Sequence, residues 1–273
     1  MNSDESPLRI GTVPFSNAWP LTHYLCQELP GATVSQWFPS EMRLRLTAHH
    51  LDLAMMPVAE LMYLPYGKIV SDCCIGCRGP VWSVRLISTV PLAQIKTLSL
   101  DTASRSSVTL CELILRQFFD NSPKKFKLNP HRPLNACKTD AFVVIGDRAL
   151  AFEPADRWKY CFDLGELWQK KTGLPFVFAA WIGCTPQTWN RLELVHRLQS
   201  ARDRGVESVH TILDEKEAVG IPLPVSRKRM GEYLSRAVHY RADNQDQLAI
   251  QTFFDFAVLV GLTKHRTVLE WIH

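Results

Sequence analysis

Short apolar strands alternate with helices along most of the chain, and this alternation limits the fold more than any other feature. The first stretch predicts a strand at Leu8–Val13, a helix from about Pro20 to Glu28, a helix from an N-cap at Ser40 to about His49, and a strand at Leu53–Met56 that Pro57 ends. Strands joined by helical crossovers run parallel, so this order is typical of α/β proteins.

The alternation resumes after residue 69 and gives way to a helical tail. Further strands are predicted near Val70–Ile75, Val84–Ser88, Leu98–Leu100, Ala141–Ile145 and Val177–Trp181. An amphipathic helix is expected from Ser107 to Phe119, and another at Leu164–Thr172 with Gly173 as its C-cap. After Trp181 helices are expected to open at Thr185, Ser226 and Asn244.

Two consecutive α/β stretches followed by helices favour an α/β clamshell of two lobes. Residues 1–88 and 182–273 are predicted to form lobe one, residues 89–181 lobe two, and the cleft between them the active site. The periodicity by itself also permits one continuous doubly wound sheet.

Charge and hydrophobicity exclude several classes of function. The formal net charge of +4 suits an anionic small molecule, whereas the densest basic cluster, at Lys124, Lys125 and Lys127, lacks the breadth and aromatic residues of a nucleic-acid surface. The apolar run Phe253–Val260 is shorter than the roughly 20 residues of a membrane span. Residues 1–7 are polar and acidic, unlike a secretory signal, so we expect a cytoplasmic location and no membrane partner.

Motifs for metals and strong nucleophiles are absent from the sequence. Cys74 and Cys77 have C-x-x-C spacing, but no second ligand pair follows at a zinc-site distance, and we expect the eight cysteines to be buried or half-buried thiols. His49 and His50 are adjacent and face different directions on a helix. The sequence contains no G-x-S-x-G, H-E-x-x-H, Walker or G-x-G-x-x-G motif. We therefore expect neither a metal nor a cofactor.

Polar residues follow the predicted strands, where α/β sheets bind their ligands. The candidates are Asn17 after the first strand, Arg78 and Gly79 ahead of Ser83, the segment Thr102–Ser107, and Asp147. In that segment Ser104, Ser106 and Ser107 precede or open a helix, whose free N–H groups favour a carboxylate or phosphate. Ordinary helix capping by Ser104 or Ser106 explains the same residues equally well.

The two most specific longer motifs in the sequence are Arg78-Gly-Pro-Val-Trp-Ser-Val84 and Leu100-Asp-Thr-Ala-Ser-Arg-Ser-Ser-Val108. They resemble motifs of the chorismate dehydratases of the futalosine route to menaquinone. The resemblance covers residues 8–182 and weakens toward Tyr233-Leu234 and Gly261-Leu262. The other matching runs are Arg9–Asn17, Leu51–Pro57, Ile145–Leu150, Asp163–Trp168 and Gly173–Trp181.

The resemblance implies a fold and a set of site residues. It implies a periplasmic-binding-protein-like clamshell of type II with mixed sheets and a helical C-terminal segment. It places Asn17 and Ser83 at the reacting end as catalytic residues, with Ser106 and Ser107 gripping a carboxylate. The other expected substrate contacts are Arg78, Gly79, Thr102, Ser104 and Asp147. Cys74 and Cys77 depart from the small or apolar residues of the family, without consequence for the chemistry.

The implied reaction removes water from chorismate to give 3-[(1-carboxyvinyl)oxy]benzoate, which needs no cofactor because an aromatic ring forms. Asn17 and Ser83 are neutral at pH 7, so we expect them to position the substrate while its own enolpyruvyl carboxylate takes the C3 proton. Asp147 is an alternative base, or else a structural carboxylate paired with Arg148 or capping a turn. Chorismate is the only partner expected, and the sequence leaves monomer and homodimer open.

Two other functions remain possible for such a fold. The 1,4-dihydroxy-6-naphthoate synthase of the same pathway carries a histidine base after the strand that here ends in Ile145-Gly-Asp147, and no histidine stands there. A non-catalytic protein that binds an anionic solute is the second alternative, since a fold does not determine a function.

Overall fold

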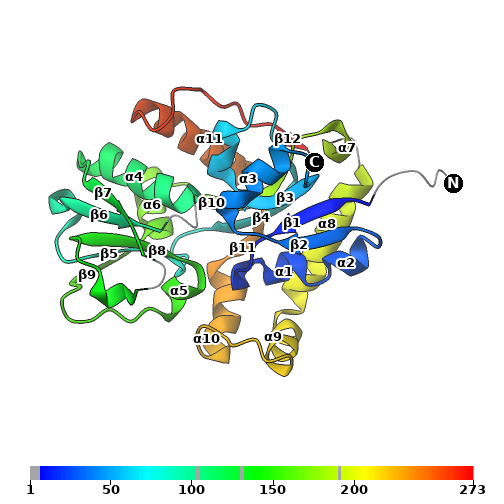
Figure 1. Ribbon diagram of the computed structural model, residues 1–273, viewed down its shortest axis with the longest axis horizontal. Helices are drawn as coiled ribbons and strands as arrows, with labels where there is room; N and C mark the ends of the chain where they lie inside the picture. The colour runs from blue at the N-terminus through cyan, green and yellow to red at the C-terminus, as the bar shows by residue number, and fades with distance from the viewer. Residues whose placement is uncertain (1–6, 102–104, 130–131, 190–191, 273) are drawn as a thin grey trace.

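Two lobes, each built around one mixed sheet, make up the molecule in a computed structural model that describes residues 7–101, 105–129, 132–189 and 192–272 (Figure 1). In the first sheet the strands follow the order β11-β4-β10-β3-β1-β2, with β12 also paired to β4. In the second sheet the order is β7-β6-β8-β5-β9. The predicted two-lobed α/β fold with mixed sheets is confirmed.

The strands of the first sheet come from both ends of the chain. They are β1 (Arg9–Thr12), β2 (Thr33–Gln36), β3 (Leu53–Pro57), β4 (Lys68–Cys77), β10 (Phe176–Gly183), β11 (His239–Arg241) and β12 (Trp271–Ile272). The second sheet comes from one continuous stretch. Its strands are β5 (Val84–Ser88), β6 (Thr97–Leu100), β7 (Lys124–Lys127), β8 (Ala141–Ile145) and β9 (Tyr160–Asp163).

Helices cover the faces of both sheets. Those of the first lobe are α1 (Trp19–Thr22), α2 (Leu25–Glu28), α3 (Pro39–Thr47), α7 (Pro186–Trp189), α8 (Leu192–Glu207), α9 (Val209–Ala218), α10 (Arg227–Glu232) and α11 (Asn244–Leu259), with the short turns η1 (Ser16–Ala18), η2 (Val58–Tyr63) and η5 (Tyr233–Ala237). The second lobe has α4 (Arg105–Phe119), α5 (Gly146–Ala151), α6 (Leu164–Thr172), η3 (Leu92–Gln94) and η4 (Leu134–Ala136). Among these described helices, none is both long and apolar enough to cross a membrane.

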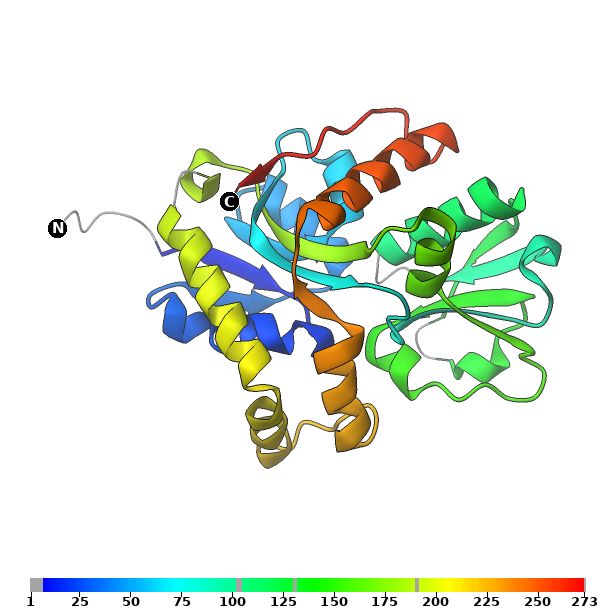
Figure 2. The same cartoon turned by 180° about the vertical axis from the view of Figure 1, so that it is seen from behind.

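The lobes are joined through β4 and β10, which lie side by side in the first sheet (Figure 2). They run antiparallel, with Phe176 opposite Cys77, so the outgoing and returning chains cross at the same place. The outgoing connection is residues 78–83, which we call the strap. Because the strap leads straight from the first sheet into β5 of the second, its shape decides how the lobes face one another.

The lobe boundaries differ from the predicted crossings near residues 89 and 181. Strand β5, which was expected in lobe one, pairs with β8 and β9 in the second sheet. Strand β10, which was expected in lobe two, pairs with β3 and β4 in the first sheet. The chain therefore crosses at the strap and returns before Phe176. Pro91, near the predicted boundary at residue 89, lies beyond β5 and precedes η3.

The helical C-terminal segment completes the first lobe. Its last long helix, α11, packs on β10 and also reaches α4 of the second lobe. Phe253 and Phe254 on this helix are buried in the core, and Phe256 makes an edge contact with Phe118 on α4. Two short strands in this segment, β11 and β12, were not predicted from the sequence.

Local signals placed most helix ends within a few residues. Ser226 caps α10 by accepting from the Arg229 N–H, and Gly173 ends α6 with a positive φ of 75°. The predicted cap at Ser40 differs, because α3 begins at Pro39 and Phe38 occupies the N-cap position. The predicted helix from Pro20 to Glu28 is broken into α1 and α2 by a turn at His23 and Tyr24.

The cysteines are thiols, as expected. All eight are free. Cys73, Cys74, Cys77 and Cys111 are buried and Cys137 and Cys184 are half-buried, but Cys26 and Cys161 are exposed, contrary to the prediction that every thiol is at least half-buried. Burial raises the pKa of Cys73 to about 12, which keeps that thiol neutral and unreactive at physiological pH.

Candidate active site

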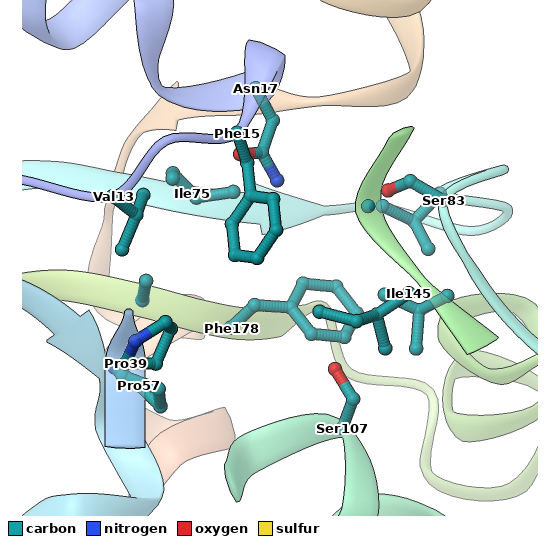
Figure 3. Close-up of a pocket in the computed structure, with 14 residues that line it drawn as sticks. Val13, Phe15, Asn17, Pro39, Pro57, Ile75, Ser83, Ser107, Ile145 and Phe178 are labelled. Atoms are coloured by element: carbon teal, nitrogen blue, oxygen red, sulfur yellow. The ribbon is translucent and has the colours of Figure 1, made fainter. Parts of the chain in front are cut away.

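A cleft lies between the two lobes and is lined by both (Figure 3). We call it the interlobe cleft. The first lobe contributes Val13, Phe15, Asn17, Pro39, Pro57, Ile75, Phe178 and Ala179; the strap and second lobe contribute Val81, Ser83, Val84, Ser107, Ile145 and Gly146. Because both lobes contribute to it, the site is complete only when the two lobes face one another.

The walls of the interlobe cleft are apolar and uncharged. Phe15 and Phe178 project into it from opposite sides, and no charged side chain is among the described residues that line it. Its polar side chains are those of Asn17, Ser83 and Ser107. An apolar site with a few polar groups suits a flat organic ring whose substituents are held at fixed points.

Asn17 reaches the cleft from η1, directly after the turn that follows β1. Its Oδ1 atom is buried and has no hydrogen-bond partner among the described residues. A buried acceptor without a donor costs free energy, so its persistence points to a ligand that supplies the donor. The structure thus places Asn17 in the wall of the interlobe cleft.

Ser83 ends the strap and points toward Asn17 from the other lobe (Figure 3). Its side chain is buried, and its hydroxyl oxygen accepts a hydrogen bond from the Tyr233 hydroxyl at 2.8 Å. Its carbonyl accepts from the Gly146 N–H at 2.8 Å, which ties the strap to the start of α5. Ser83 is therefore fixed through both its backbone and its side chain.

Asp163 holds the strap in its shape. Its carboxylate accepts from the N–H groups of Val81 and Trp82 at 3.0 and 2.6 Å, and it also caps α6. Trp82 has a φ of 64°, a left-handed conformation that bulky residues rarely adopt. Strained backbone of this kind persists where surrounding contacts enforce it, which here happens immediately before Ser83.

The two serines that open α4 have different surroundings. Ser107 lines the interlobe cleft, near the positive end of the helix dipole. Ser106 does not line the cleft, because its buried hydroxyl accepts from the Ala59 N–H of η2 at 3.1 Å. Of the two serines, Ser107 therefore lines the interlobe cleft, whereas Ser106 lies in a contact between the lobes.

A buried glutamate reinforces that contact between the lobes. The Glu60 carboxylate lies 3.1 Å from the Arg105 guanidinium of α4 and 2.9 Å from that of Arg43 on α3. Each guanidinium is partly exposed, while the carboxylate is almost fully buried. Glu60 thus joins η2, α3 and the first turn of α4 beside the end of the cleft that Ser107 lines.

Asp147 lies in the first turn of α5 but does not line the interlobe cleft. Its carboxylate accepts from the Ser16 hydroxyl and, at 3.4 Å, from the Ser16 N–H on the opposite lobe. Burial raises the pKa of Asp147, and the two bonds from Ser16 oppose that rise. The alternative in which Asp147 pairs with Arg148 is not the contact seen, since the Arg148 guanidinium lies 3.6 Å from the Asp101 carboxylate.

Arg78 and Gly79 also have roles other than the expected substrate contacts. The Arg78 guanidinium bonds Asp243 and Asp246 at the start of α11, both at 2.9 Å, and neither strap residue lines the interlobe cleft. Gly79 has a φ of 106°, a conformation that glycine adopts without a steric penalty. Both residues shape and anchor the strap.

The remaining expectations concern Thr102 and Ser104, which lie outside the described residues. Sequence reasoning missed Phe15, Ser16, Phe178 and the role of Tyr233. Phe15 and Phe178 lay within matched motifs, but nothing in the pattern separated them from ordinary core residues. Within the described ranges, no three histidine, cysteine or acidic side chains cluster as metal ligands.

Comparison with known proteins agrees with this architecture. A protein from Archaeoglobus fulgidus of known structure matches with a TM-score of 0.75 and 13% identity, over 95% of this chain and 99% of that one. The periplasmic aliphatic sulphonate binding protein of Escherichia coli matches with a TM-score of 0.64 and 17% identity, over 97% and 90%. These likenesses confirm the periplasmic-binding-protein-like fold.

The sequence comparisons identify the family. The chain is 26% identical to the chorismate dehydratase of Thermus thermophilus over 90% of its own length and 94% of that protein. A sequence model of a family described as menaquinone biosynthesis matches residues 8–258, which include every described residue of the interlobe cleft. The chain therefore belongs to this menaquinone biosynthesis family.

Proposed function

We propose that the chain is a chorismate dehydratase, a lyase that converts chorismate to 3-[(1-carboxyvinyl)oxy]benzoate and water. The observation that carries the proposal is the uncharged interlobe cleft in which Asn17 and Ser83 face one another. The resemblance of the sequence motifs to those of chorismate dehydratases implies that these same two side chains lie at the reacting end. The dehydratase name of the Thermus thermophilus relative supports the same reaction.

The chemistry needs positioning more than it needs a strong catalyst. Chorismate carries a ring carboxylate, an enolpyruvyl ether at C3 and a hydroxyl at C4. Loss of the C3 proton and cleavage of the C4–O bond release one water and leave an aromatic ring, whose formation drives the reaction. The protein has to bind two carboxylates, exclude water, and hold the C3 proton beside a base.

The interlobe cleft offers a matching surface for each part of this substrate. Phe15 and Phe178 supply apolar walls for the ring, and Ser107 at the tip of α4 suits a carboxylate. Asn17 and Ser83 lie where they can hydrogen-bond the C4 hydroxyl as it departs. A hydroxyl group donates to the orphan Oδ1 of Asn17 and accepts from Ser83, which satisfies all three polar groups.

The base in this proposal is the enolpyruvyl carboxylate of the substrate itself. Asn17, Ser83 and Ser107 are neutral at physiological pH, and they are the polar side chains that line the described part of the cleft. Asp147, the alternative base, uses its carboxylate to bind Ser16 outside the cleft lining. A carboxylate that arrives with the substrate removes the need to bury a second base beside a dianion.

Asp147→Asn tests this assignment. The amide keeps an acceptor for the Ser16 hydroxyl, so we expect kcat for chorismate to stay close to that of the wild-type protein. Loss of a general base instead costs about 10² to 10⁴-fold in rate. Steady-state turnover of the purified variant distinguishes the two, and a loss of a hundredfold or more makes Asp147 the base.

The same variant has a pH signature in stability. The pKa of Asp147 is raised from its ordinary value of 3.8, chiefly by burial, so the folded state holds this proton more tightly than the unfolded state does. The resulting stabilisation is complete below 3.8 and is lost as the pH rises through the raised pKa. The amide of the variant does not titrate, so Tm of the variant should exceed that of the wild type at pH 7 and converge with it in acid. A constant difference contradicts the raised pKa.

Incubation of the purified protein with chorismate tests the function itself. We expect chorismate to disappear while a benzoate-type absorbance grows, with a product lighter by one water in mass spectrometry. Chorismate that is bound but recovered unchanged identifies a binding protein. Chorismate that is neither bound nor consumed leaves the sibling naphthoate synthase as the alternative. We further propose that this reaction takes place in the cytoplasm on free chorismate.

A further inference from the structure

The Tyr233 hydroxyl connects the two side chains expected at the reacting end. Tyr233 is 1% exposed, and its hydroxyl donates to the Ser83 oxygen at 2.8 Å. The Asn17 side chain also hydrogen-bonds to this hydroxyl. Tyr233 comes from the C-terminal segment of the first lobe, so one buried phenol links η1, the strap and the turn η5.

The number of protons available fixes the direction of the hydrogen bonds that link Asn17, Tyr233 and Ser83. A phenol has one proton, and the Tyr233 proton lies in the bond to Ser83. The lone pairs of the same oxygen accept from the Asn17 amide, which can only donate through its nitrogen. Burial raises the pKa of Tyr233 well above its ordinary value, so the hydroxyl keeps this proton at physiological pH.

The direction of these hydrogen bonds has consequences for both Ser83 and Asn17. The Ser83 oxygen accepts a hydrogen bond from the Tyr233 hydroxyl, so the Ser83 hydroxyl proton has to point elsewhere. The open side of Ser83 is the interlobe cleft. Asn17 turns its nitrogen toward Tyr233 and retains an unpaired Oδ1. The protein thus presents one donor, on Ser83, and one acceptor, on Asn17, to a single hydroxyl group.

The surroundings of Tyr233 hold it in this orientation. Its ring stacks on that of Trp82, with centroids 6.4 Å apart and an angle of 28° between the planes. Tyr233 is also the first residue of η5, a five-residue π-helical turn, and such turns are frequent at functional sites. The strained strap residue Trp82 and the π turn therefore meet at the residue that orients Ser83.

We propose that Tyr233 is a positioning residue that orients the Ser83 hydroxyl so that it donates to the leaving oxygen of the substrate. The inference rests on the proposed function for the identity of that oxygen. The direction of the Tyr233–Ser83 bond does not depend on it. Tyr233 touches no reacting atom in this proposal and acts only through Ser83 and Asn17.

Tyr233→Phe removes the phenol oxygen and keeps the ring against Trp82. We expect kcat for chorismate to fall about tenfold, the worth of one hydrogen bond, because the Ser83 proton is free to turn away from the cleft. KM should stay close to the wild-type value, since the ring and carboxylate contacts are unchanged. A kcat equal to that of the wild type overturns the proposal.

Tyr240→Phe is the matched control. Tyr240 is also buried, 4% exposed, and its hydroxyl has no hydrogen-bond partner among the described residues. Its loss should leave kcat unchanged. A second arm combines Tyr233→Phe with Ser83→Ala, where the tyrosine change should lower kcat less than twofold further. A full tenfold loss in that background means that Tyr233 does not act through Ser83, and it refutes the proposal.

The same cycle can be read without turnover, which separates this inference from the proposed function. Thermal unfolding of the four proteins without ligand reports whether the two hydroxyls are bonded. We expect the losses of Tm from Tyr233→Phe and Ser83→Ala to be clearly less than additive in the double variant. Additive losses overturn the proposal even if the wild type dehydrates chorismate. If the Tm losses are less than additive but the wild type leaves chorismate unchanged, the Tyr233–Ser83 hydrogen bond is supported and only the proposed function is refuted.

Discussion

Ser83→Ala is expected to lower kcat/KM for chorismate dehydration by about 10²-fold or more, and Asn17→Ala by a similar factor. In the proposed mechanism, Ser83 supplies the donor to the departing hydroxyl, and Asn17 supplies the acceptor that aligns it. The interlobe cleft has no charged group among its described lining residues to compensate for either loss. Steady-state kinetics with purified variants measure the effect, with circular dichroism to establish that each variant is folded.

A buried serine away from the interlobe cleft provides the control. Ser88 is fully buried in β5, and its hydroxyl bonds the carbonyl of Val90 at 2.7 Å. Ser88→Ala removes a buried hydroxyl as Ser83→Ala does, so it should lower stability and leave kcat/KM unchanged. If Ser83→Ala and Asn17→Ala both keep near-wild-type kcat/KM, the assignment of the reacting end to these side chains is refuted.

Gly205→Ala is expected to cause the largest loss of stability from a minimal change. Gly205 lies on α8 where that helix crosses α1, and a Cβ atom there would stand 1.9 Å from the Pro20 carbonyl oxygen. The obstacle is backbone, so the helices have to separate. We expect the free energy of unfolding to fall by about 3 kcal/mol, the upper end of the usual overpacking range. Urea unfolding followed by circular dichroism measures it.

Gly231→Ala is the matched helix substitution. A Cβ on Gly231 would lie 3.4 Å from the His210 ring, an ordinary contact with a side chain. Alanine is the better helix former by about 1 kcal/mol, so this variant should be as stable as the wild type or more so. Equal effects of the two substitutions would show that the α1–α8 contact does not require glycine.

Much of the fold follows from local signals in the sequence. The strands β3, β5 and β8 are apolar runs bounded by Pro57, Pro91 or Gly146, and their predicted ranges lie within one residue of the observed ones. The lobe boundaries were harder to predict, because β5 and β10 are apolar strands that either sheet could bury. Which sheet a buried strand joins depends on long-range pairing, and the strand pattern carries no information about it.

The candidate site likewise contains residues that local sequence signals indicate and residues that only the folded structure reveals. Asn17, Ser83 and Ser107 were singled out because each stands beside the end of a predicted strand or helix within a matched motif, and all three line the interlobe cleft. Tyr233 was not assigned a role, because a tyrosine in a tail of aromatic helices is indistinguishable from a core residue until its hydroxyl is placed beside Ser83. Asp147 was judged a possible base, and only the position of Ser16 on the facing lobe reveals a different partner.

A crystal structure of the Asn17→Ala variant with chorismate tests most directly whether a neutral cleft lets the substrate supply its own base. We expect the ring between Phe15 and Phe178, the C4 hydroxyl within hydrogen-bond distance of Ser83, and the enolpyruvyl carboxylate beside the hydrogen of C3. Chorismate bound outside the interlobe cleft, or the Asp147 carboxylate turned from Ser16 to face C3, would contradict that mechanism.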